Sequence, residues 1–200
     1  MNATDSIPIQ SEIEATFLDI DKPTLRQKIQ SLGGKLLQPE TLMRRTIFDS
    51  GTHSFVRVRD EGNCITMTYK YFADISLSGA KEINLIVNDY NNAVNLVKAC
   101  GLQIKAHQET LREEWQLDDV ELDIDTWPGL PTYVEIEGPS EASVKTAAAK
   151  LGFDFKDAHF GAVDQIYHFY YGVSQDEVNN CAEIVFEELP VFLEGKTRLR

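Results

Sequence analysis

Val56-Arg57-Val58-Arg59 and Val134-Glu135-Ile136-Glu137 both alternate an aliphatic with a charged residue. Successive side chains of a β-strand point to opposite faces, so each stretch places two like charges on one face and two aliphatic side chains on the other. Glu12-Ile13-Glu14 and Asp123-Ile124-Asp125 repeat the arrangement. An ordinary antiparallel strand carries assorted polar residues on its outer face. The repeated pairs therefore predict a sheet with one strongly charged face.

The apolar faces of these strands need a partner, and the sequence also contains helices with apolar faces. If the helices pack outside, the sheet closes with its charges around a common axis and leaves no free edge. We therefore predict an α+β fold, a closed eight-stranded antiparallel β-barrel with helices packed outside. The expected strands lie near residues 9–18, 42–49, 54–60, 63–72, 80–88, 108–117, 119–126 and 132–138, with one more at 183–186. The expected helices lie near residues 22–32, 90–100, 140–151 and 160–171.

Length and composition restrict the class of protein. The chain has 200 residues, 42% of them hydrophobic, and a formal net charge of −13. We expect one barrel domain over residues 1–175 and an acidic tail, residues 176–200, that packs on or near it. The acidic balance argues against a nucleic-acid partner, because phosphate backbones require a basic face.

Three cysteines without metal-ligand spacing predict reduced thiols. Residues 1–10 do not resemble a signal peptide, and no apolar run is long enough to span a bilayer. We expect a cytoplasmic protein without a membrane partner, either a monomer or a homodimer.

The charges of the predicted interior fall into two sets. The basic set suits phosphate oxygens and consists of Arg57, Arg59, Lys70 and Arg112. The acidic set supplies the hard oxygen ligands that Mg²⁺ or Mn²⁺ prefers and consists of Glu12, Glu14, Asp125, Glu135 and Glu137. Together they predict a site for a metal–polyphosphate complex.

Simpler interpretations stay open for single residues of this set. The charges are also compatible with solvated outer faces, and the matched pairs on successive strands are what favours an interior. Arg112 precedes Glu113 and Glu114, so local ion pairing is an alternative for it. Trp115 and Trp127 are predicted to be core aromatics, and the four histidines do not cluster at metal-ligand spacing.

The order of these motifs resembles the CYTH family, the triphosphate tunnel metalloenzymes. The resemblance covers about residues 10–172 and rests on Glu12-Ile13-Glu14-Ala15-Thr16, Val56-Arg57-Val58-Arg59, Thr66-Met67-Thr68-Tyr69-Lys70, Glu82, Arg112, Asp125 and Tyr133-Val134-Glu135-Ile136-Glu137-Gly138. It implies a barrel open at both ends, in which carboxylates hold divalent metals and basic residues hold a small-molecule triphosphate. Glu82 matches an acidic residue of the tunnel, and we expect Glu82 and Asp125 to be catalytic.

The family includes inorganic triphosphatases, thiamine triphosphatases and class IV adenylyl cyclases. The resemblance therefore implies metal-dependent hydrolysis of inorganic or thiamine triphosphate. One alternative is a cyclase that converts ATP to cyclic AMP and pyrophosphate. Another is a non-catalytic nucleotide or polyphosphate binder, because Thr16 stands where the family has a lysine.

Two further positions depart from the family pattern. Asn84 replaces a common acidic residue, and Thr110 replaces a common basic one. Arg45 and Lys81 are open alternatives for the missing positive charge, although strand alternation places Lys81 on the face opposite to Glu82.

Overall fold

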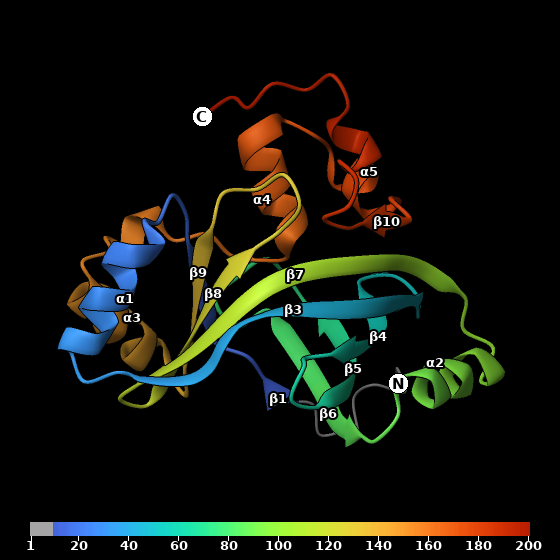
Figure 1. Cartoon of the computed structure of the whole chain (residues 1–200), viewed down its shortest axis with the longest axis horizontal. Helices are drawn as coiled ribbons and strands as arrows, with labels where there is room; N and C mark the ends of the chain where they lie inside the picture. The colour runs from blue at the N-terminus through green and yellow to red at the C-terminus, as the bar shows by residue number, and fades with distance from the viewer. Residues whose placement is uncertain (1–9) are drawn as a thin grey trace.

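A curled antiparallel sheet dominates the computed structural model, which describes residues 10–200 (Figure 1). Within these residues the strands follow the order β1-β6-β5-β4-β3-β7-β8-β9-β2, and β10 pairs with β7. Their bounds are β1 Gln10–Ser11, β2 Glu14–Phe17, β3 Lys35–Asp49, β4 Ser54–Asp60, β5 Ile65–Phe72, β6 Ala80–Val87, β7 Ile104–Leu117, β8 Val120–Thr126, β9 Tyr133–Glu137 and β10 Glu183–Ile184. Residues 1–9, where the prediction of an absent signal peptide mostly falls, lie outside the described part.

Tight turns set the register that brings the charged residues onto one face. The β4–β5 connection includes Gly62 at φ +84°, and the β7–β8 connection includes Asp118 at φ +53°. Glycine adopts such a backbone without steric cost, and aspartate tolerates it better than most residues. In the resulting ladders Arg112 faces Asp125, and Asp123 faces Glu135.

The N-terminal segment, residues 10–17, contains the strands at both ends of the strand order. β1 pairs with β6, and β2 pairs with β9. The Glu12 and Glu14 amides donate to Ala80 and Leu77 on one side, and Gly138 donates to Ile13 on the other. A curled antiparallel α+β fold is thus confirmed, whereas complete closure into a barrel stays a prediction.

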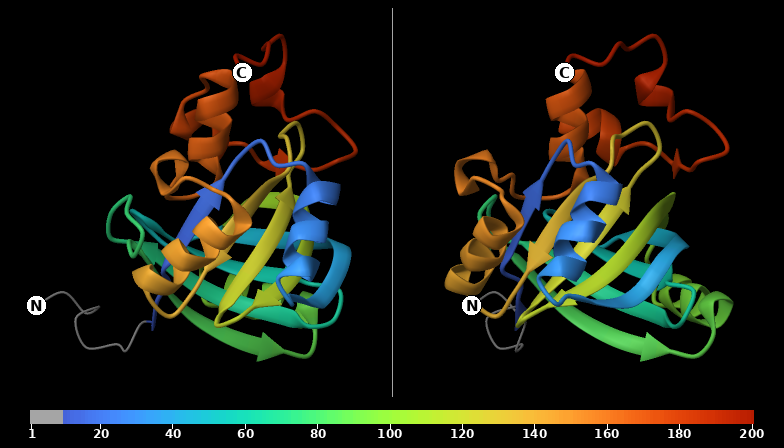
Figure 2. Two further views of the ribbon diagram at one scale, coloured as in Figure 1. Left: turned by 90° about the vertical axis from the view of Figure 1, so that its left-hand side faces the viewer. Right: turned by 60° about the vertical axis from the view of Figure 1, so that its left-hand side comes forward.

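Two helices cover the outer face of β7–β9, on the left of Figure 1 (see also Figure 2). They are α1 (Lys22–Ser31), capped by the side chain of Asp21, and α3 (Glu141–Leu151), capped by that of Ser140. Each cap accepts from a backbone N–H group that the first helical turn leaves without a partner. The outward-facing side chains of β8 and β9, including Leu122, Ile124, Val134 and Ile136, are fully buried in this cluster.

The third helix, α2 (Tyr90–Ala99), packs on β4 through Ala93 and Val97. It leaves part of the outer face of β6 uncovered, so Leu85 is 52% exposed although strand alternation places it on the face opposite to Glu82. The sequence pattern shows which face a side chain takes but not how far a neighbouring helix extends over it.

The C-terminal part adds α4 (Val163–Tyr171), α5 (Gln175–Asn179) and the strand β10. β10 is shorter than the predicted strand 183–186 and pairs in parallel with β7. Val173, Val178, Ile184 and Phe192 are buried in one cluster with Trp127 and Tyr133 of the sheet region. Two short 3-10 turns, Phe155–Asp157 and Val191–Leu193, complete the description. Among the described residues, no helix has the length and apolar character needed to cross a bilayer.

Candidate functional site

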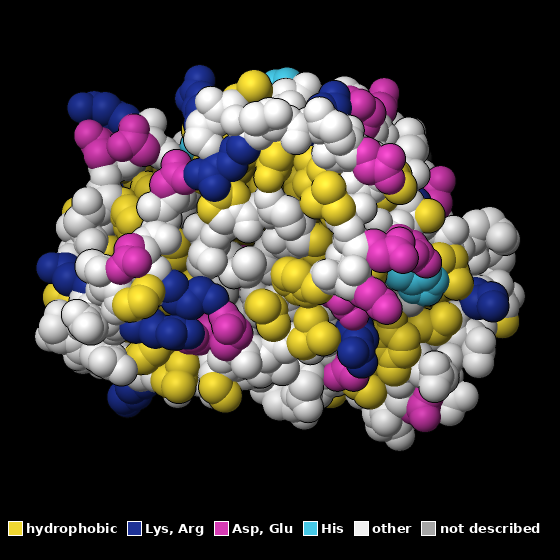
Figure 3. Space-filling model, turned by 45° about the horizontal axis from the view of Figure 1, so that its top comes forward, with side chains coloured by type: hydrophobic (Ala, Val, Ile, Leu, Met, Phe, Trp, Pro, Cys, Tyr) yellow, Lys and Arg dark blue, Asp and Glu magenta, His cyan; other side chains and the backbone are white. Residues whose placement is uncertain are grey.

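A cavity of about 1000 Å³ lies against the charged face of the sheet. Every predicted site residue lines it, namely Glu12, Glu14, Arg57, Arg59, Lys70, Glu82, Arg112, Asp125, Glu135 and Glu137. All except Glu12, which lies between β1 and β2, stand on strands of the sheet. Further lining residues come from α5 and its surroundings, among them Gln175, Asp176, Asn179 and Asn180. On the outer face shown in Figure 3, acidic and basic side chains are interspersed rather than gathered in one patch.

Arg112 holds three carboxylates at the centre of one cavity wall. Its Nε donates to Asp125 at 2.7 Å, one Nη donates to Glu135 at 2.9 Å, and the other pairs with Asp123. Arg112 therefore does not pair with its sequence neighbours Glu113 and Glu114, which was the alternative interpretation. Because three carboxylates face one guanidinium, the cluster retains negative charge. Burial and the charges of Asp125 and Glu135 raise the pKa of Asp123, although Arg112 opposes the shift.

Lys70 organises a second group of carboxylates around the N-terminal segment. Its Nζ lies 2.5 Å from Glu12 and 3.9 Å from Glu14. Glu82 faces Lys70 across the β5–β6 ladder. Burial and the neighbouring Glu12 carboxylate raise the pKa of Glu82 to about 7.

Arg59 and Arg57 share one face of β4 but differ in their partners. Arg59 pairs with Glu61 at 2.7 Å, and Glu61 also accepts from the Thr66 hydroxyl. Among the described residues Arg57 has no carboxylate within ion-pair distance, and its Nε is buried without a hydrogen-bond partner. Burial, and then the positive charge of Arg59, lowers the pKa of Arg57 to about 9, which leaves the side chain protonated at neutral pH.

Arg45 on β3 also lines the cavity, although the predicted phosphate-binding set does not include it. Its guanidinium lies 4.7 Å from the ring centroid of Trp127 and donates to the Thr110 hydroxyl. Trp127 is buried, as predicted for a core aromatic, but it also forms part of the cavity wall. Arg45 lies opposite Arg59 in the β3–β4 ladder, but its sequence neighbours on the same face, Met43 and Ile47, are apolar, so strand alternation alone does not mark it as a site residue.

The positions that depart from the family pattern differ in whether they line the cavity. Thr16 is buried on β2, where its backbone pairs with His159, and it does not line the cavity. Asn84 lines the cavity and accepts from the Thr68 hydroxyl. Lys81 is absent from the lining, in agreement with the predicted orientation.

The acidic set fits a divalent cation by its donor chemistry. Burial raises the pKa of Glu135 and of Glu137 to about 7, and neighbouring carboxylates add to both shifts. One oxygen of Asp123 is buried without a hydrogen-bond partner among the described residues. Hard oxygen ligands with uncompensated negative charge are what Mg²⁺ and Mn²⁺ bind. Within residues 10–200, however, no three candidate ligands are gathered around one point, and Arg112 and Lys70 hold several of them.

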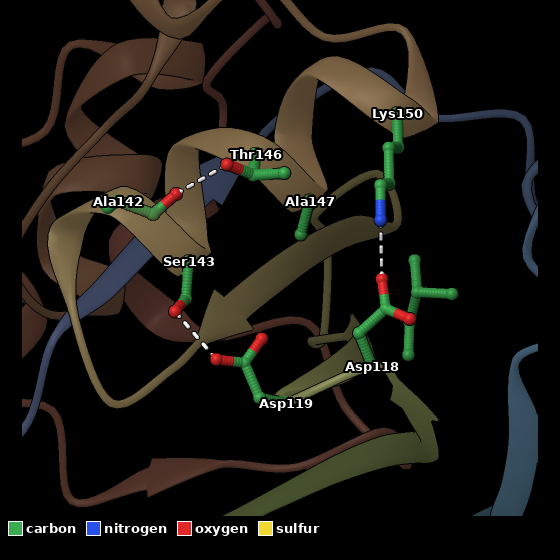
Figure 4. A pocket seen from close by; sticks show the side chains of 8 residues that line it. Asp118, Asp119, Ala142, Ser143, Thr146, Ala147 and Lys150 are labelled. Carbon is green, nitrogen blue, oxygen red and sulfur yellow. Dashed lines mark hydrogen bonds and ion pairs between the residues drawn. The ribbon is translucent and has the colours of Figure 1, made fainter.

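A second, smaller pocket lies outside the sheet, between the β7–β8 turn and α3 (Figure 4). It has a volume of about 280 Å³. Its polar groups satisfy one another, because Lys150 pairs with Asp118 at 2.6 Å and the Ser143 hydroxyl donates to Asp119 at 2.7 Å. None of the predicted site residues lies there.

The fold thus combines a curled antiparallel sheet with a cavity lined by both acidic and basic side chains. The CYTH domain model matches residues 10–170, and the chain belongs to the CYTH family. A comparison with curated proteins found no match.

Solved structures share the fold. The PH1012 protein from Pyrococcus horikoshii OT3 has a TM-score of 0.64 and 22% identity, covering 74% of this chain and 94% of that one. A "putative adenylate cyclase" from Vibrio parahaemolyticus has a TM-score of 0.67 and 9% identity, covering 78% and 97%. The "putative adenylyl cyclase HpAC1" from Hippeastrum, described with a dominant triphosphatase activity, has a TM-score of 0.53 and 13% identity, covering 79% and 94%. At these identities the similarity concerns the fold.

Proposed function

We propose that the cavity binds a small-molecule triphosphate with Mg²⁺ or Mn²⁺ and hydrolyses its terminal phosphoanhydride. The observation that carries the proposal is Arg57, a cavity-lining guanidinium without a carboxylate partner among the described residues. A charged side chain that is partly buried without an ion-pair partner is compensated only in part, so an anionic ligand would stabilise it. The surrounding carboxylates favour an anion that arrives with metal ions over a nucleic acid or a membrane surface.

The proposal includes a closed tunnel. Residues 10–17 pair with β6 through β1 and with β9 through β2, which supports closure by the N-terminal strand. Closure would keep water away from the charged groups and strengthen their interactions with a ligand. In this arrangement Glu12 and Glu14 stand on the closing strand and would belong to the metal-binding set.

The residues proposed to hold divalent cations are Glu12, Glu14, Asp125, Glu135 and Glu137. A bound cation would neutralise phosphate charge and orient the phosphate chain. Arg112 and Lys70 compensate these carboxylates in the protein alone. With cations bound to the carboxylates, both basic side chains would become available for phosphate oxygens.

The other roles follow from position in the cavity. Arg57, Arg59, Lys70 and Arg112 would bind the phosphates and bring the terminal phosphorus into reach of a water molecule. We assign Glu82 as the general base that takes the proton of this water as its oxygen attacks phosphorus and the anhydride oxygen leaves. Asp125 would support the same step as a metal ligand; in the protein alone it binds Arg112 through two nitrogen atoms.

Two alternatives have support of their own. A cyclase is favoured by the adenylate cyclase description of the Vibrio parahaemolyticus structure. In that reaction the ribose 3′-hydroxyl of ATP would attack the α-phosphorus, forming cyclic AMP and releasing pyrophosphate. A non-catalytic binder is favoured by Thr16, which adds no charge and lies outside the cavity lining.

One assay separates these functions. The protein is incubated with Mg²⁺ or Mn²⁺ and, in turn, tripolyphosphate, thiamine triphosphate and ATP, and the products are identified. Orthophosphate from tripolyphosphate or thiamine triphosphate supports hydrolysis, cyclic AMP from ATP supports the cyclase, and tight binding without turnover supports the binder. If no triphosphate binds at all, the proposed site is wrong.

A further inference from the structure

Arg45 is a buried cation among other cations. Its side chain is on the cavity wall, and the residue is only 7% exposed. No carboxylate of the described residues forms an ion pair with it, and its Nε has no hydrogen-bond partner there. Burial, and then the charges of Arg59 and Arg57, lowers its pKa. Such an arrangement is unfavourable in the protein alone, and a bound anion would relieve it.

Two neighbours hold the guanidinium in place. Trp127 lies beneath it at 4.7 Å, a distance typical of a cation–π contact. Thr110, on the adjacent strand β7, accepts from one of its Nη atoms. The Nε of Arg45 is buried and has no hydrogen-bond partner among the described residues, so the guanidinium keeps an unsatisfied donor. Arg45 is therefore oriented before a ligand arrives, which limits the entropy lost on binding.

We propose that Arg45 is an anion-binding residue of the cavity, which contacts the phosphate chain beside Arg57 and Arg59. This inference rests on the proposed function, because it assumes that the cavity takes a triphosphate. Thr110 has no charge, and its hydroxyl is the group that receives the Arg45 side chain. The positive charge at this part of the wall thus comes from β3 and not from β7.

A structural role for Arg45 predicts different behaviour. If the residue only packed against Trp127, its replacement would lower the melting temperature and leave ligand affinity unchanged in the folded protein. A residue retained for an anion has the opposite signature. Removing its uncompensated charge raises the melting temperature of the ligand-free protein and lowers the affinity for the ligand.

The test is calorimetric titration of Mg²⁺–tripolyphosphate into the full chain at constant ionic strength. We expect Arg45→Met to weaken binding by about tenfold or more, the effect of losing a charge-assisted contact. Arg45→Lys keeps the positive charge but not the planar guanidinium, so it should lose less affinity than Arg45→Met does. The matched control is Arg44→Gln, the neighbouring residue on the opposite face of β3, exposed and paired with Glu109. It should bind within about twofold of the parent protein.

The outcomes distinguish the inference from the proposed function. Weak binding by Arg45→Met, with a ligand-free melting temperature at or above that of the parent, supports the inference. Unchanged binding by Arg45→Met together with weakened binding by Arg57→Ala overturns it and leaves the proposed function standing. If Arg45→Met does not fold, Arg45→Gln removes the same charge, and parental affinity in that variant would overturn the inference. No binding by the parent protein removes both proposals.

Discussion

Arg57 is the residue on which the proposed binding site depends most. Its Nη donates to the Thr68 hydroxyl at 3.3 Å, a contact too long to compensate a full charge. We expect Arg57→Ala to weaken tripolyphosphate binding by about tenfold to a hundredfold, because hydrogen bonds to charged groups contribute roughly 1.5–3 kcal/mol. Calorimetric titration measures the change. Parental affinity in this variant would place the ligand elsewhere.

Glu137 tests the metal assignment separately from the phosphate assignment. Burial and the charges of Glu12 and Glu14 raise its pKa, which indicates local repulsion between carboxylates. We expect Glu137→Gln to weaken Mn²⁺ binding by about tenfold, since ligand charge count sets the affinity of carboxylate sites. Titration with Mn²⁺ in the absence of triphosphate measures it. Glu183→Gln on β10 is the control, and equal Mn²⁺ affinity in both variants would contradict the assignment.

Most residues of this site could be predicted from the sequence, because strand alternation is a local property. Glu12, Arg57, Lys70 and Glu135 could be assigned to one face from their immediate neighbours. Their pairing could not, because it depends on strands far apart in the chain. In the structure, members of the predicted basic and acidic sets pair with one another, as Arg112 does with Asp125 and Glu135. Arg45 was left out because its role depends on Trp127 and Thr110.

At the scale of elements, an ion pair between α1 and β7 adds to the apolar packing of Leu25 and Ile29. Arg26 binds Glu113, which also accepts from the Trp115 ring at 2.6 Å. Burial raises the pKa of Glu113, but the hydrogen bonds from Arg26 and Trp115 outweigh it and the net shift is downward. The pair therefore stabilises the fold above the unfolded-state pKa of this carboxyl, and this contribution is lost as the pH falls through the folded-state pKa.

We expect Glu113→Gln to lower the melting temperature at pH 7 by a few degrees and to flatten its decline towards pH 3. Melting curves recorded over this range provide the measurement. Glu141→Gln removes an exposed carboxylate of α3 and should leave the profile unchanged. A Glu113→Gln profile parallel to that of the parent protein would show that the ion pair contributes nothing to the pH dependence.

The C-terminal segment is attached to the sheet by β10. Ile184 is fully buried beside β7, whereas Leu189, five residues later, is 57% exposed. We expect Ile184→Ala to destabilise the fold by about 2–4 kcal/mol, the usual effect of emptying a buried aliphatic site. Leu189→Ala is the control, with an effect within about 0.5 kcal/mol. Urea unfolding compares the two, and equal stabilities would show that β10 is detached in solution.

Element boundaries show where sequence patterns lose information. The strand expected at 9–18 is divided into β1 and β2, because its two parts pair with different strands. β3 begins at Lys35 and not near residue 42, since irregularities near Gln38 interrupt the alternation while the pairing with β7 continues. The α5 helix escaped prediction because it has only five residues. Long-range pairing decides such cases, and a local window does not contain it.

At the scale of the whole molecule, the cavity collects carboxylates that the protein alone compensates only in part. A divalent cation that binds the folded state but not the unfolded chain must stabilise the fold. We expect Mg²⁺ to raise the melting temperature more than NaCl of matched ionic strength does, and EDTA to reverse the gain. Identical melting temperatures in the two salts would contradict a cation site in the cavity.

The central claim is that the charged interior holds a triphosphate together with metal ions. A crystal structure of the protein with tripolyphosphate and Mn²⁺, with the metal located by anomalous scattering, tests it directly. We predict tripolyphosphate inside the cavity in contact with Arg57, and manganese bound to oxygens from the set formed by Glu12, Glu14, Asp125, Glu135 and Glu137. Tripolyphosphate and manganese bound only outside the cavity, or a cavity that holds neither, would contradict the account.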